Sequence, residues 1–357
     1  MPPVGFSTLT VTEVERDTPE SVILTLAADD RDAFRFAHGQ YLTFRREVDD
    51  VELRRSYSIC SPAPSGALRV GIKRVDGGAF STWATSAVQV GDELEALPPM
   101  GSFTHELDPA TRRSYVLVAG GSGITPIYSV AATILENEPR SLVTLLQVDR
   151  TTGTIMLLDD VEGLRNRFLD RFRVWRQLTR EDPGMELLSG RPDVASVEAC
   201  IERGLLDAEP DHVFICGPQP IVEAVQAVYA DHGLAPERIH TELFTTAQRG
   251  RAQQRARGPV DESITPIGSG TVLMEGRSAE FSLYEGDTIL EAVQRVRPDV
   301  PYSCEAGVCS TCRARLADGA VEMETTYGLV PGDEDAGFIL TCQAVPTTST
   351  VAVDFDA

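Results

Sequence analysis

The sequence contains no apolar run long enough to cross a membrane. A membrane-spanning helix needs about 18 or more predominantly apolar residues in succession, and no stretch of the 357 residues approaches this. The first residues, Met1 to Phe6, also lack the positively charged start and apolar core of a secretory signal. These two absences predict a cytoplasmic protein that does not enter a membrane.

Positive charge is scarce. The chain has 32 Lys and Arg against 54 Asp and Glu, a formal net charge of −22. Binding to nucleic acid requires a basic surface, so this balance argues against nucleic acid as a partner. The last part, residues 268–357, holds 15 acidic and five basic residues. Such acidity could steer it toward a basic face of a partner protein, or it could serve solubility alone.

Residues that usually carry acid–base or nucleophilic catalysis form no convincing group. The five histidines are scattered along the sequence, and we expect each to be structural or solvent-facing; they are His38, His105, His212, His232 and His240. There are seven cysteines, and because four of them follow the metal-binding spacing described next, they argue against a disulfide framework and for a reducing compartment. Any catalysis by this protein must therefore depend on groups other than these side chains.

Four of the cysteines form the most informative pattern in the chain. Cys304, Cys309 and Cys312 follow the spacing C-x4-C-x2-C, and Cys342 comes 30 residues later. This is the plant-type spacing for a [2Fe–2S] cluster held by four thiolates. Gly307 allows the tight bend that three ligands on one loop require. A zinc site would more often show symmetric C-x2-C pairs, and buried free cysteines are the remaining alternative.

The first part of the chain, residues 5–109, predicts an all-β unit. Short alternating segments recur with Pro, Gly and Asp between them, which is typical of a barrel or a sandwich. On one of these strands an R-x-Y-S pattern places Arg55 and Tyr57 on one face and Ser58 on the other or at a bend. A guanidinium, an aromatic ring and a hydroxyl suit an isoalloxazine ring and a diphosphate, although a solvated arginine and a core tyrosine would give the same pattern.

A glycine turn follows this strand pattern. Gly77 and Gly78 precede a short predicted helix that carries Ser81 and Thr82 in its first turn. Backbone N–H groups and hydroxyls at such a helix start can hold a phosphate. Alone, the turn would carry little information, but its place after the R-x-Y-S strand favours a flavin nucleotide site.

Residues 112–245 predict alternating strands and helices, and thus a parallel sheet with helices on both faces. The first strand leads into Gly120-Gly121-Ser122-Gly123-Ile124-Thr125-Pro126, a glycine loop that opens a helix and suits a pyrophosphate. Thr125 is expected to cap this helix. Cys216 ends a later strand, where its thiol could lie over a nicotinamide ring or simply be buried.

The last third begins with a predicted linker and continues as a small α+β fold. Residues 246–267 combine arginines with Gln, Ala and Gly and show no apolar period. We expect a solvated tether there; a contact with the acidic last domain is the alternative. Two short strands then precede a helix over 288–296, with Asp287 as its expected cap, and the cysteine loop follows.

The order of these motifs resembles the ferredoxin–NADP reductase superfamily with a C-terminal ferredoxin domain, over essentially the whole chain. Within it, several stretches are similar to the reductase subunits of ring-1,2-phenylacetyl-CoA epoxidases, among them 55–61, 77–83, 98–104, 138–141, 308–314 and 353–356. The resemblance implies an antiparallel FAD-binding β-barrel (1–109), an α/β NAD(P)-binding domain (110–245), a linker (246–267) and a β-grasp [2Fe–2S] ferredoxin domain (268–357).

The resemblance also implies roles for individual residues. Those expected to hold FAD are Arg55, Tyr57, Ser58, Lys73, Gly78, Ser81 and Thr82. Those expected to line the nicotinamide nucleotide site are Gly120, Gly121, Gly123, Thr125, Arg150, Cys216 and Phe244. Ser58, Cys216 and Glu242 are expected next to the reacting atoms, and Cys304, Cys309, Cys312 and Cys342 to bind the cluster.

One position departs from the family pattern. Where these reductases commonly have Gly-Asn-Arg, this chain has Val148-Asp149-Arg150. An acidic residue there would favour the ribose 2′-hydroxyl of NADH, whereas Arg150 could bind the 2′-phosphate of NADPH. The family implies NADPH, and Asp149 leaves NADH open.

The function expected from the resemblance is an electron relay from NAD(P)H through FAD and the cluster to a separate oxygenase, in this family a di-iron enzyme. Two alternatives remain open at the level of sequence. One is a reductase for another oxygenase, such as a ketosteroid or aromatic-ring hydroxylase. The other is a non-enzymatic iron–sulfur carrier or redox sensor, against which the intact flavin and nucleotide motifs argue.

Overall fold

The computed structural model describes residues 5–48, 51–244, 265–330 and 332–357. They fall into two compact units, one spanning described residues 6–244 and the other built mainly from 265–357. Each unit has its own buried apolar core. Among the described residues, no helix combines the length and apolarity that a bilayer crossing needs.

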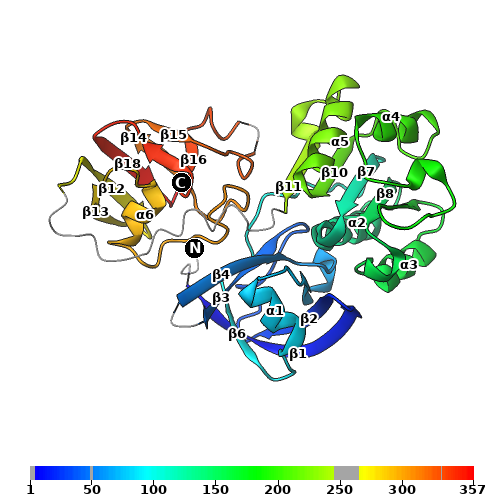
Figure 1. Cartoon of the computed structure of the whole chain (residues 1–357), viewed down its shortest axis with the longest axis horizontal. Coiled ribbons are helices and arrows are strands. Elements are labelled where there is room, and N and C mark those ends of the chain that lie inside the picture. Colours follow the sequence, from blue (N-terminus) through cyan, green and yellow to red (C-terminus); the bar gives the residue numbers. More distant parts are fainter. Residues whose placement is uncertain (1–4, 49–50, 245–264, 331) are drawn as a thin grey trace. The chain divides into compact units, whose positions relative to one another are not determined.

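The first sheet has six antiparallel strands in the order β4-β3-β6-β1-β2-β5 (Figure 1). The strands are β1 (Ser7–Thr18), β2 (Ser21–Ala28), β3 (Tyr41–Val48), β4 (Val51–Ser58), β5 (Leu68–Lys73) and β6 (Glu93–Ala96). A bridge between Ile59 and Val70 joins the chain after β4 to β5 at the opposite edge. The sheet therefore curls into a barrel, as predicted, around a core that includes Leu24 and Phe44.

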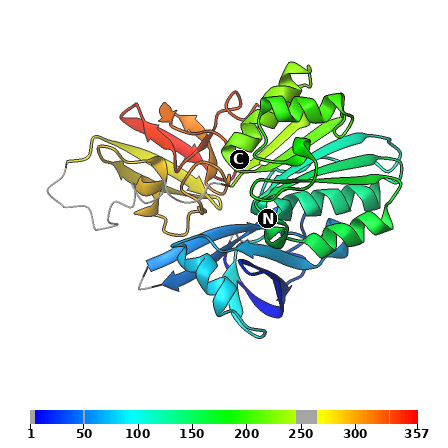
Figure 2. The same ribbon diagram turned by 45° about the vertical axis from the view of Figure 1, so that its right-hand side comes forward.

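The second sheet has five parallel strands in the order β11-β10-β7-β8-β9. They are β7 (Ser114–Gly120), β8 (Leu142–Asp149), β9 (Phe172–Leu178), β10 (His212–Gly217) and β11 (Ile239–Leu243). The helices are α2 (Ile124–Asn137), α3 (Leu158–Arg167), α4 (Val194–Glu202) and α5 (Gln219–Asp231), and they cover both faces (Figure 2). This confirms the predicted parallel α/β architecture.

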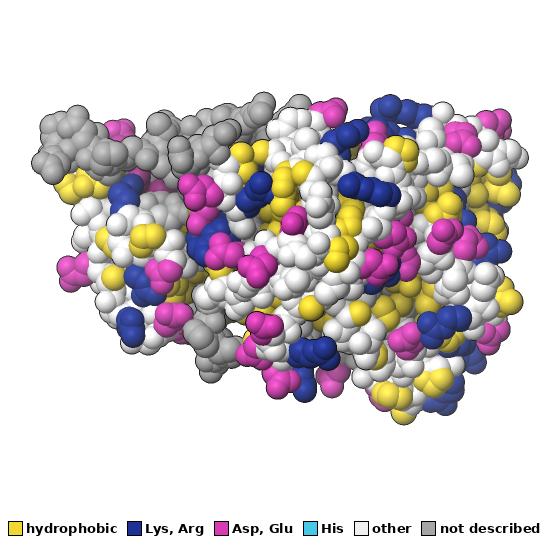
Figure 3. All heavy atoms as spheres, turned by 90° about the horizontal axis from the view of Figure 1, so that it is seen from below, with side chains coloured by type: hydrophobic (Ala, Val, Ile, Leu, Met, Phe, Trp, Pro, Cys, Tyr) yellow, Lys and Arg dark blue, Asp and Glu magenta, His cyan; other side chains and the backbone are white. Residues whose placement is uncertain are grey.

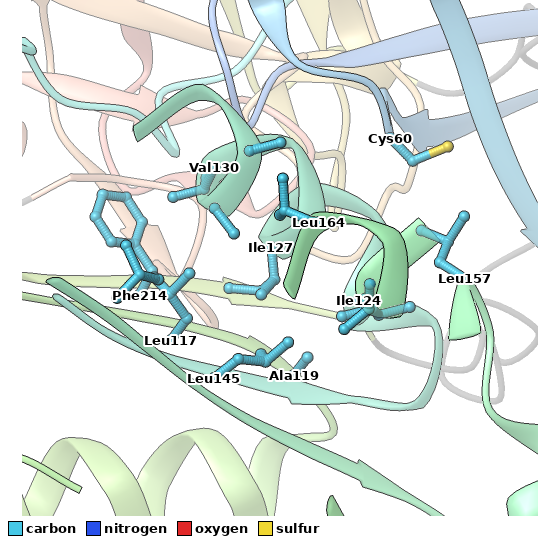
Figure 4. Packing of buried hydrophobic residues seen from close by; sticks show 14 of the residues in the cluster. Cys60, Leu117, Ala119, Ile124, Ile127, Val130, Leu145, Leu157, Leu164 and Phe214 are labelled. Atoms are coloured by element: carbon cyan, nitrogen blue, oxygen red, sulfur yellow. The ribbon is translucent and has the colours of Figure 1, made fainter. Parts of the chain in front are cut away.

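Helix α2 joins this sheet to the barrel. Its apolar residues Ile124, Ile127 and Val130 recur at three-residue spacing and pack on Leu117 and Phe214 of the sheet (Figure 4). Its polar residues face the barrel: the Ser129 hydroxyl donates to the Ser61 carbonyl at 2.7 Å, and the Thr133 hydroxyl accepts from the Ala63 amide at 3.0 Å. The barrel and the parallel sheet thus share one packed unit.

Two predicted helix caps are wrong. Gly123 precedes α2, so Thr125 lies in the first turn, and its hydroxyl donates to the Ser122 carbonyl at 2.9 Å. At α6 (Ile289–Gln294) the cap is Thr288, which forms a reciprocal capping box with Glu291. Asp287 instead pairs with Arg295. In both cases the expected residue lies one or two positions from the real cap, a displacement that the sequence pattern does not reveal.

The last unit is a mixed five-stranded sheet in the order β13-β12-β18-β14-β16, with α6 packed on it. Its strands are β12 (Gly268–Met274), β13 (Arg277–Leu283), β14 (Arg313–Asp318), β16 (Phe338–Leu340) and β18 (Thr350–Asp354). Strands β12 and β18 pair in parallel and the other pairs are antiparallel. A separate pair, β15 (Val321–Met323) and β17 (Ala344–Pro346), completes the predicted α+β fold.

The surface charges are mixed on the face drawn in Figure 3. Acidic side chains lie among basic and apolar ones there, and no large area of one sign stands out. The net charge of −22 is therefore not gathered into one patch on this face.

Candidate redox site

The R-x-Y-S residues lie at the end of β4, paired with β3. Tyr57 is opposite Leu42, and Ser58 is opposite Tyr41. The Tyr57 ring packs at 5.4 Å from the ring of Phe80, which opens the adjacent helix, and burial raises the pKa of the Tyr57 hydroxyl. The hydroxyl thus stays neutral and able to donate. Ser58 is buried, and Arg55 directs one guanidinium N–H to the Arg54 carbonyl at 2.7 Å.

In the glycine turn before α1, the missing side chain lets other atoms approach the backbone closely. Gly78 precedes α1 (Ala79–Ser86), and a Cβ at Gly78 would lie 2.7 Å from the Ser81 hydroxyl. The Ser81 hydroxyl accepts from the Val75 amide at 3.1 Å and so fixes the turn, whereas Thr82 is exposed. The first turn of α1 holds no acidic residue. N–H groups in the first turn of a helix have no acceptor within the helix, so the start of α1 suits a diphosphate.

Gly120 and Gly123 bring the end of β7 against the end of β10. A Cβ on Gly123 would lie 2.2 Å from the Cys216 carbonyl oxygen, and one on Gly120 would lie 2.7 Å from Pro218. Gly121 has a φ of +55°, which favours glycine. Thr125 is buried, and its methyl group would lie 2.5 Å from a Cβ at Gly71 of β5. Thr125 therefore packs the loop onto the barrel.

Cys216 and Glu242 are neighbours on parallel strands β10 and β11. The Cys216 side chain is fully buried, and burial raises its pKa well above the usual range. Burial also raises the pKa of Glu242 to about 8, and its buried Oε2 has no hydrogen-bond partner among the described residues. Phe244 follows β11, and its amide donates to the Gly217 carbonyl at 3.1 Å. This strand end thus holds an inert thiol and a carboxyl that can hold a proton near neutral pH.

The end of β8 carries Asp149 and Arg150. Asp149 is 5% exposed; its Oδ1 accepts from the Thr154 hydroxyl at 2.6 Å and lies 3.7 Å from the Lys73 ammonium. Arg150 is partly exposed and pairs with Glu20, in the turn between β1 and β2. In this structure Lys73, expected at the flavin diphosphate, therefore faces Asp149.

The four cysteines expected to bind the cluster form two pairs in the last unit. The thiols of Cys304 and Cys309 are hydrogen-bonded to each other, as are those of Cys312 and Cys342. Hydrogen bonding from Cys309 lowers the pKa of Cys304 to about 6, while the pKa values of Cys309 and Cys342 are raised. In the described part of the chain, no three metal-ligating side chains surround a single ion site. Two pairs fit a two-iron cluster, because each iron takes two thiolates.

The loop around these thiols is shaped by its backbone. Glu305 and Ser310 have φ values of +51° and +57°, which are uncommon for residues other than glycine. The Ala306 amide donates to the Cys304 sulfur at 3.4 Å. A Cβ on Gly307 would lie 2.8 Å from the Gln343 side chain. Strained backbone of this kind collects at functional sites, and N–H donors to sulfur suit thiolates that carry a cluster.

The structure also brings together residues that the sequence leaves far apart. His38, His105, His212 and His240 form one cluster, although they are scattered along the sequence. The His105 ring centroid lies 4.4 Å from that of His212 and 5.7 Å from that of His38, and His212 Nδ1 lies 3.2 Å from His240 Nε2. Burial lowers the pKa of His38 and His240 to about 4 and that of His105 to about 2. These low pKa values keep the rings of His38, His105 and His240 neutral at neutral pH.

A network of hydrogen bonds explains the structural role of one sequence motif, residues 138–141. Glu138, in the stretch 138–141, is fully buried at the end of α2. Its carboxylate accepts from the Arg113 guanidinium at 2.7 Å, the Tyr115 hydroxyl at 2.9 Å and the Ser141 hydroxyl at 2.7 Å. It also accepts from the Asp108 amide at 3.0 Å. The motif therefore anchors the segment between the barrel and the parallel sheet.

Models of three protein families match the chain in the same order as these sites. An oxidoreductase FAD-binding domain matches residues 8–105, an oxidoreductase NAD-binding domain matches 117–227, and a 2Fe-2S iron-sulfur cluster binding domain matches 272–347. The three matches cover the barrel, the parallel sheet and the cysteine loop.

Curated relatives match the whole chain. A subunit of the 1,2-phenylacetyl-CoA epoxidase from Escherichia coli is 35% identical over 358 residues, covering 99% of this chain and 98% of that protein. The ferredoxin reductase component of 3-ketosteroid-9-alpha-monooxygenase from Rhodococcus rhodochrous is 30% identical, covering 97% and 96%. Among solved structures, phthalate dioxygenase reductase has the same fold, with a TM-score of 0.59 at 23% identity and 98% coverage of both chains. The chain belongs to the ferredoxin–NADP reductase superfamily, in the group that carries a C-terminal [2Fe–2S] ferredoxin domain.

Proposed function

We propose that this protein is the NADPH-dependent reductase component of a multicomponent oxygenase. Electrons would pass from the nicotinamide nucleotide through FAD and the [2Fe–2S] cluster to the oxygenase. Bound FAD supplies the conversion of a hydride into single electrons. The observation that carries the proposal is the presence, in one chain, of a flavin barrel, a nucleotide sheet and four paired cluster thiols.

We assign residues 1–109 to a FAD-binding domain, 110–245 to a NAD(P)-binding domain, 246–267 to a linker and 268–357 to a ferredoxin domain. The gaps between sheets support these boundaries: β6 ends at Ala96 and β7 begins at Ser114, while β11 ends at Leu243 and β12 begins at Gly268. Most of the proposed linker, 245–264, lies outside the described residues.

The residues that would hold FAD surround the end of β4 and the start of α1. The Tyr57 ring offers a flat apolar surface, and the buried Ser58 hydroxyl would lie near the flavin N5 atom. Arg55 supplies positive charge, and the turn from Gly78 to Thr82 supplies N–H and hydroxyl donors for the diphosphate. Lys73, whose ammonium lies 3.7 Å from the Asp149 carboxylate in the structure, would supply a second positive charge to the same diphosphate.

The nicotinamide would lie at the carboxyl ends of β7, β10 and β11. Gly120, Gly121 and Gly123 leave room for a pyrophosphate at the start of α2, and Phe244 follows the strand that ends beside them. Cys216 would form an apolar wall, because its thiol is buried and protonated. Glu242 would hold or release a proton beside the reacting rings, because its pKa lies near 8.

The burial of Asp149 supports NADPH over NADH. A carboxylate that selects NADH must meet the ribose 2′-hydroxyl, but Asp149 is turned inward toward Thr154 and Lys73. Arg150 is the partly exposed group at this strand end, and a guanidinium is the natural partner of a 2′-phosphate.

The acceptor would be the oxygenase of a phenylacetyl-CoA epoxidase system, a di-iron enzyme. The 35% identical relative is part of such an epoxidase. A ketosteroid monooxygenase is the second candidate, because its reductase component is 30% identical over nearly the same length.

Reconstituted turnover with purified oxygenases tests this assignment. The reductase should support NADPH-driven epoxidation of phenylacetyl-CoA by the di-iron oxygenase, with product formed in proportion to NADPH consumed. The control is the same mixture with a ketosteroid oxygenase. Productive turnover with the steroid enzyme alone would overturn the choice of acceptor while leaving the reductase function intact.

A further inference from the structure

Glu20 of the flavin barrel contacts the nucleotide sheet at the position where the nucleotide's ribose is expected. Glu20 lies between β1 and β2, 130 residues before Arg150, and its carboxylate pairs with the Arg150 guanidinium at the end of β8. Both side chains are partly exposed, 33% for Glu20 and 38% for Arg150. A solute reaching Arg150 from outside therefore meets a cation whose charge is already compensated.

The other charged groups at this strand end are held by separate contacts. The Asp149 carboxylate accepts from the Thr154 hydroxyl and from the Arg150 amide, at 2.6 and 2.7 Å. The Glu181 carboxylate accepts from the amide and the hydroxyl of Thr152, at 2.7 and 2.8 Å. Among the described residues, Glu20 is thus the acidic side chain that pairs directly with the Arg150 guanidinium.

The backbone fixes both partners of this pair. The Arg74 amide donates to the Glu20 carbonyl at 2.7 Å, which ties the turn to the end of β5. The Arg180 amide donates to the Arg150 carbonyl at 2.8 Å, which ties the end of β8 to the end of β9. The carboxylate is therefore presented to the guanidinium by rigid elements on both sides.

We infer that Glu20 sets the nucleotide preference by competing with the 2′-phosphate of NADPH for the Arg150 guanidinium. This rests on the proposed use of NADPH at this site. A phosphate that approaches Arg150 must displace the carboxylate or lie beside a like charge, and either costs affinity. NADH carries a neutral hydroxyl there and meets no such penalty. Glu20 thereby reduces the difference between the affinity for NADPH and the affinity for NADH.

The test measures binding of the adenosine end alone, so that hydride transfer is not needed. The probes are adenosine 2′,5′-bisphosphate and adenosine 5′-monophosphate, titrated calorimetrically into the holoprotein. The variant is Glu20→Gln, which keeps the size and the hydrogen-bonding capacity of the side chain but removes its charge. The matched control is Glu15→Gln, which removes one charge from β1 where Glu15 pairs with Arg69.

We expect Glu20→Gln to raise the ratio of bisphosphate affinity to monophosphate affinity by about three- to tenfold. This is the range expected for the loss of a partly exposed ion pair together with the repulsion between its carboxylate and the phosphate. Glu15→Gln should leave the preference within about twofold, since long-range charge is screened by salt. In an Arg150→Gln background, Glu20→Gln should have no effect on the preference, because the shared partner is gone.

Three results would overturn the inference: an equal change in Glu15→Gln, an effect of Glu20→Gln that persists without Arg150, or a bisphosphate preference that Arg150→Gln leaves unchanged. Failure of the proposed function looks different. In that case the adenosine probes would follow the expected pattern while neither NADPH nor NADH reduced the flavin.

Discussion

At the scale of single residues, the carboxyl groups of Glu242 and Glu138 show how environment decides role. One carboxyl oxygen of Glu242 is buried with no hydrogen-bond partner in the described part of the chain, and burial raises the pKa of this group to about 8. Burial also opposes the ionisation of Glu138, but the four hydrogen bonds that its carboxylate accepts hold its pKa below the usual range. The first carboxyl can exchange a proton near neutral pH, and the second is a fixed anion that organises its surroundings.

Glu242→Gln should change how stability depends on pH. Because the pKa of Glu242 is higher in the folded than in the unfolded protein, folding favours the protonated form, and this stabilisation is lost as the pH rises through about 8. The glutamine variant should therefore unfold at a higher temperature than the native protein at about pH 9, by an amount equivalent to about 1–3 kcal/mol, with a smaller difference near pH 5. A pH-independent difference in calorimetric melting would contradict this.

Glu138→Ala should be strongly destabilising. The substitution leaves the Arg113 guanidinium and the Tyr115 hydroxyl without their buried acceptor, and breaking a buried pair in this way costs about 3–5 kcal/mol. Urea denaturation of the holoprotein measures the loss. The control is Glu136→Ala in the same helix, where an outer pair with Arg167 is removed and the expected cost is below about 1 kcal/mol. Equal losses in the two variants would refute the network.

At the scale of elements, the histidine cluster joins strands β10 and β11 to the segment that leaves the barrel. His212 and His240 lie on the two strands, and His105 lies between the barrel and β7. The pKa of His240 is lowered to about 4 by burial, and that of His105 to about 2 by burial and by the neighbouring histidines. The cluster is stable only while its rings are neutral.

Low pH should therefore destabilise the folded protein at the histidine cluster. Because the folded pKa values lie below the ordinary value near 6.5, the unfolded chain binds more protons, and stability should fall as the pH falls from about 6.5 toward 4. His105→Gln should flatten this part of the stability profile in urea denaturation. His232→Gln, which removes a histidine paired with Glu198 outside the cluster, should keep it. The same slope in all three proteins would contradict the account.

Local sequence patterns predict the elements but not the contacts between them. Alternation predicts the barrel strands, and the glycine loop predicts the start of α2, because both are properties of neighbouring residues. The pairing of Glu20 with Arg150, and the four-histidine cluster, depend on how separate elements pack, and no local signal reports it. Capping shows the limit at short range: Asp287 and Thr288 are both good caps, and only the geometry of the helix start chooses Thr288.

The same limit holds at the candidate site. The spacing of the four cysteines predicts their convergence, and the structure adds their arrangement as two pairs. The pattern could not show that Thr125 packs against β5 or that Asp149 turns inward, since both depend on contacts between the barrel and the parallel sheet. These contacts affect which groups of the glycine loop and of the end of β8 a nucleotide can bind.

At the scale of the whole molecule, the two compact units have separate cores, so their redox centres should be separable. Cys342→Ser should remove one thiolate ligand and abolish the cluster, with iron and the associated visible bands lost. Flavin content and NADPH-driven reduction of ferricyanide should persist, because the flavin and nucleotide sites lie in the other unit. Electron delivery to the oxygenase should fall to background. Loss of bound flavin in this variant would contradict the separation.

The central claim is the relay from NADPH through flavin to cluster, and an anaerobic titration of the purified holoprotein tests it most directly. NADPH, and separately NADH, is added stepwise while the visible absorbance of both centres is recorded. We predict that bleaching of the flavin is accompanied or followed by loss of the cluster bands, and that NADPH acts at the lower concentration. Reduction of neither centre by either nucleotide would contradict the account.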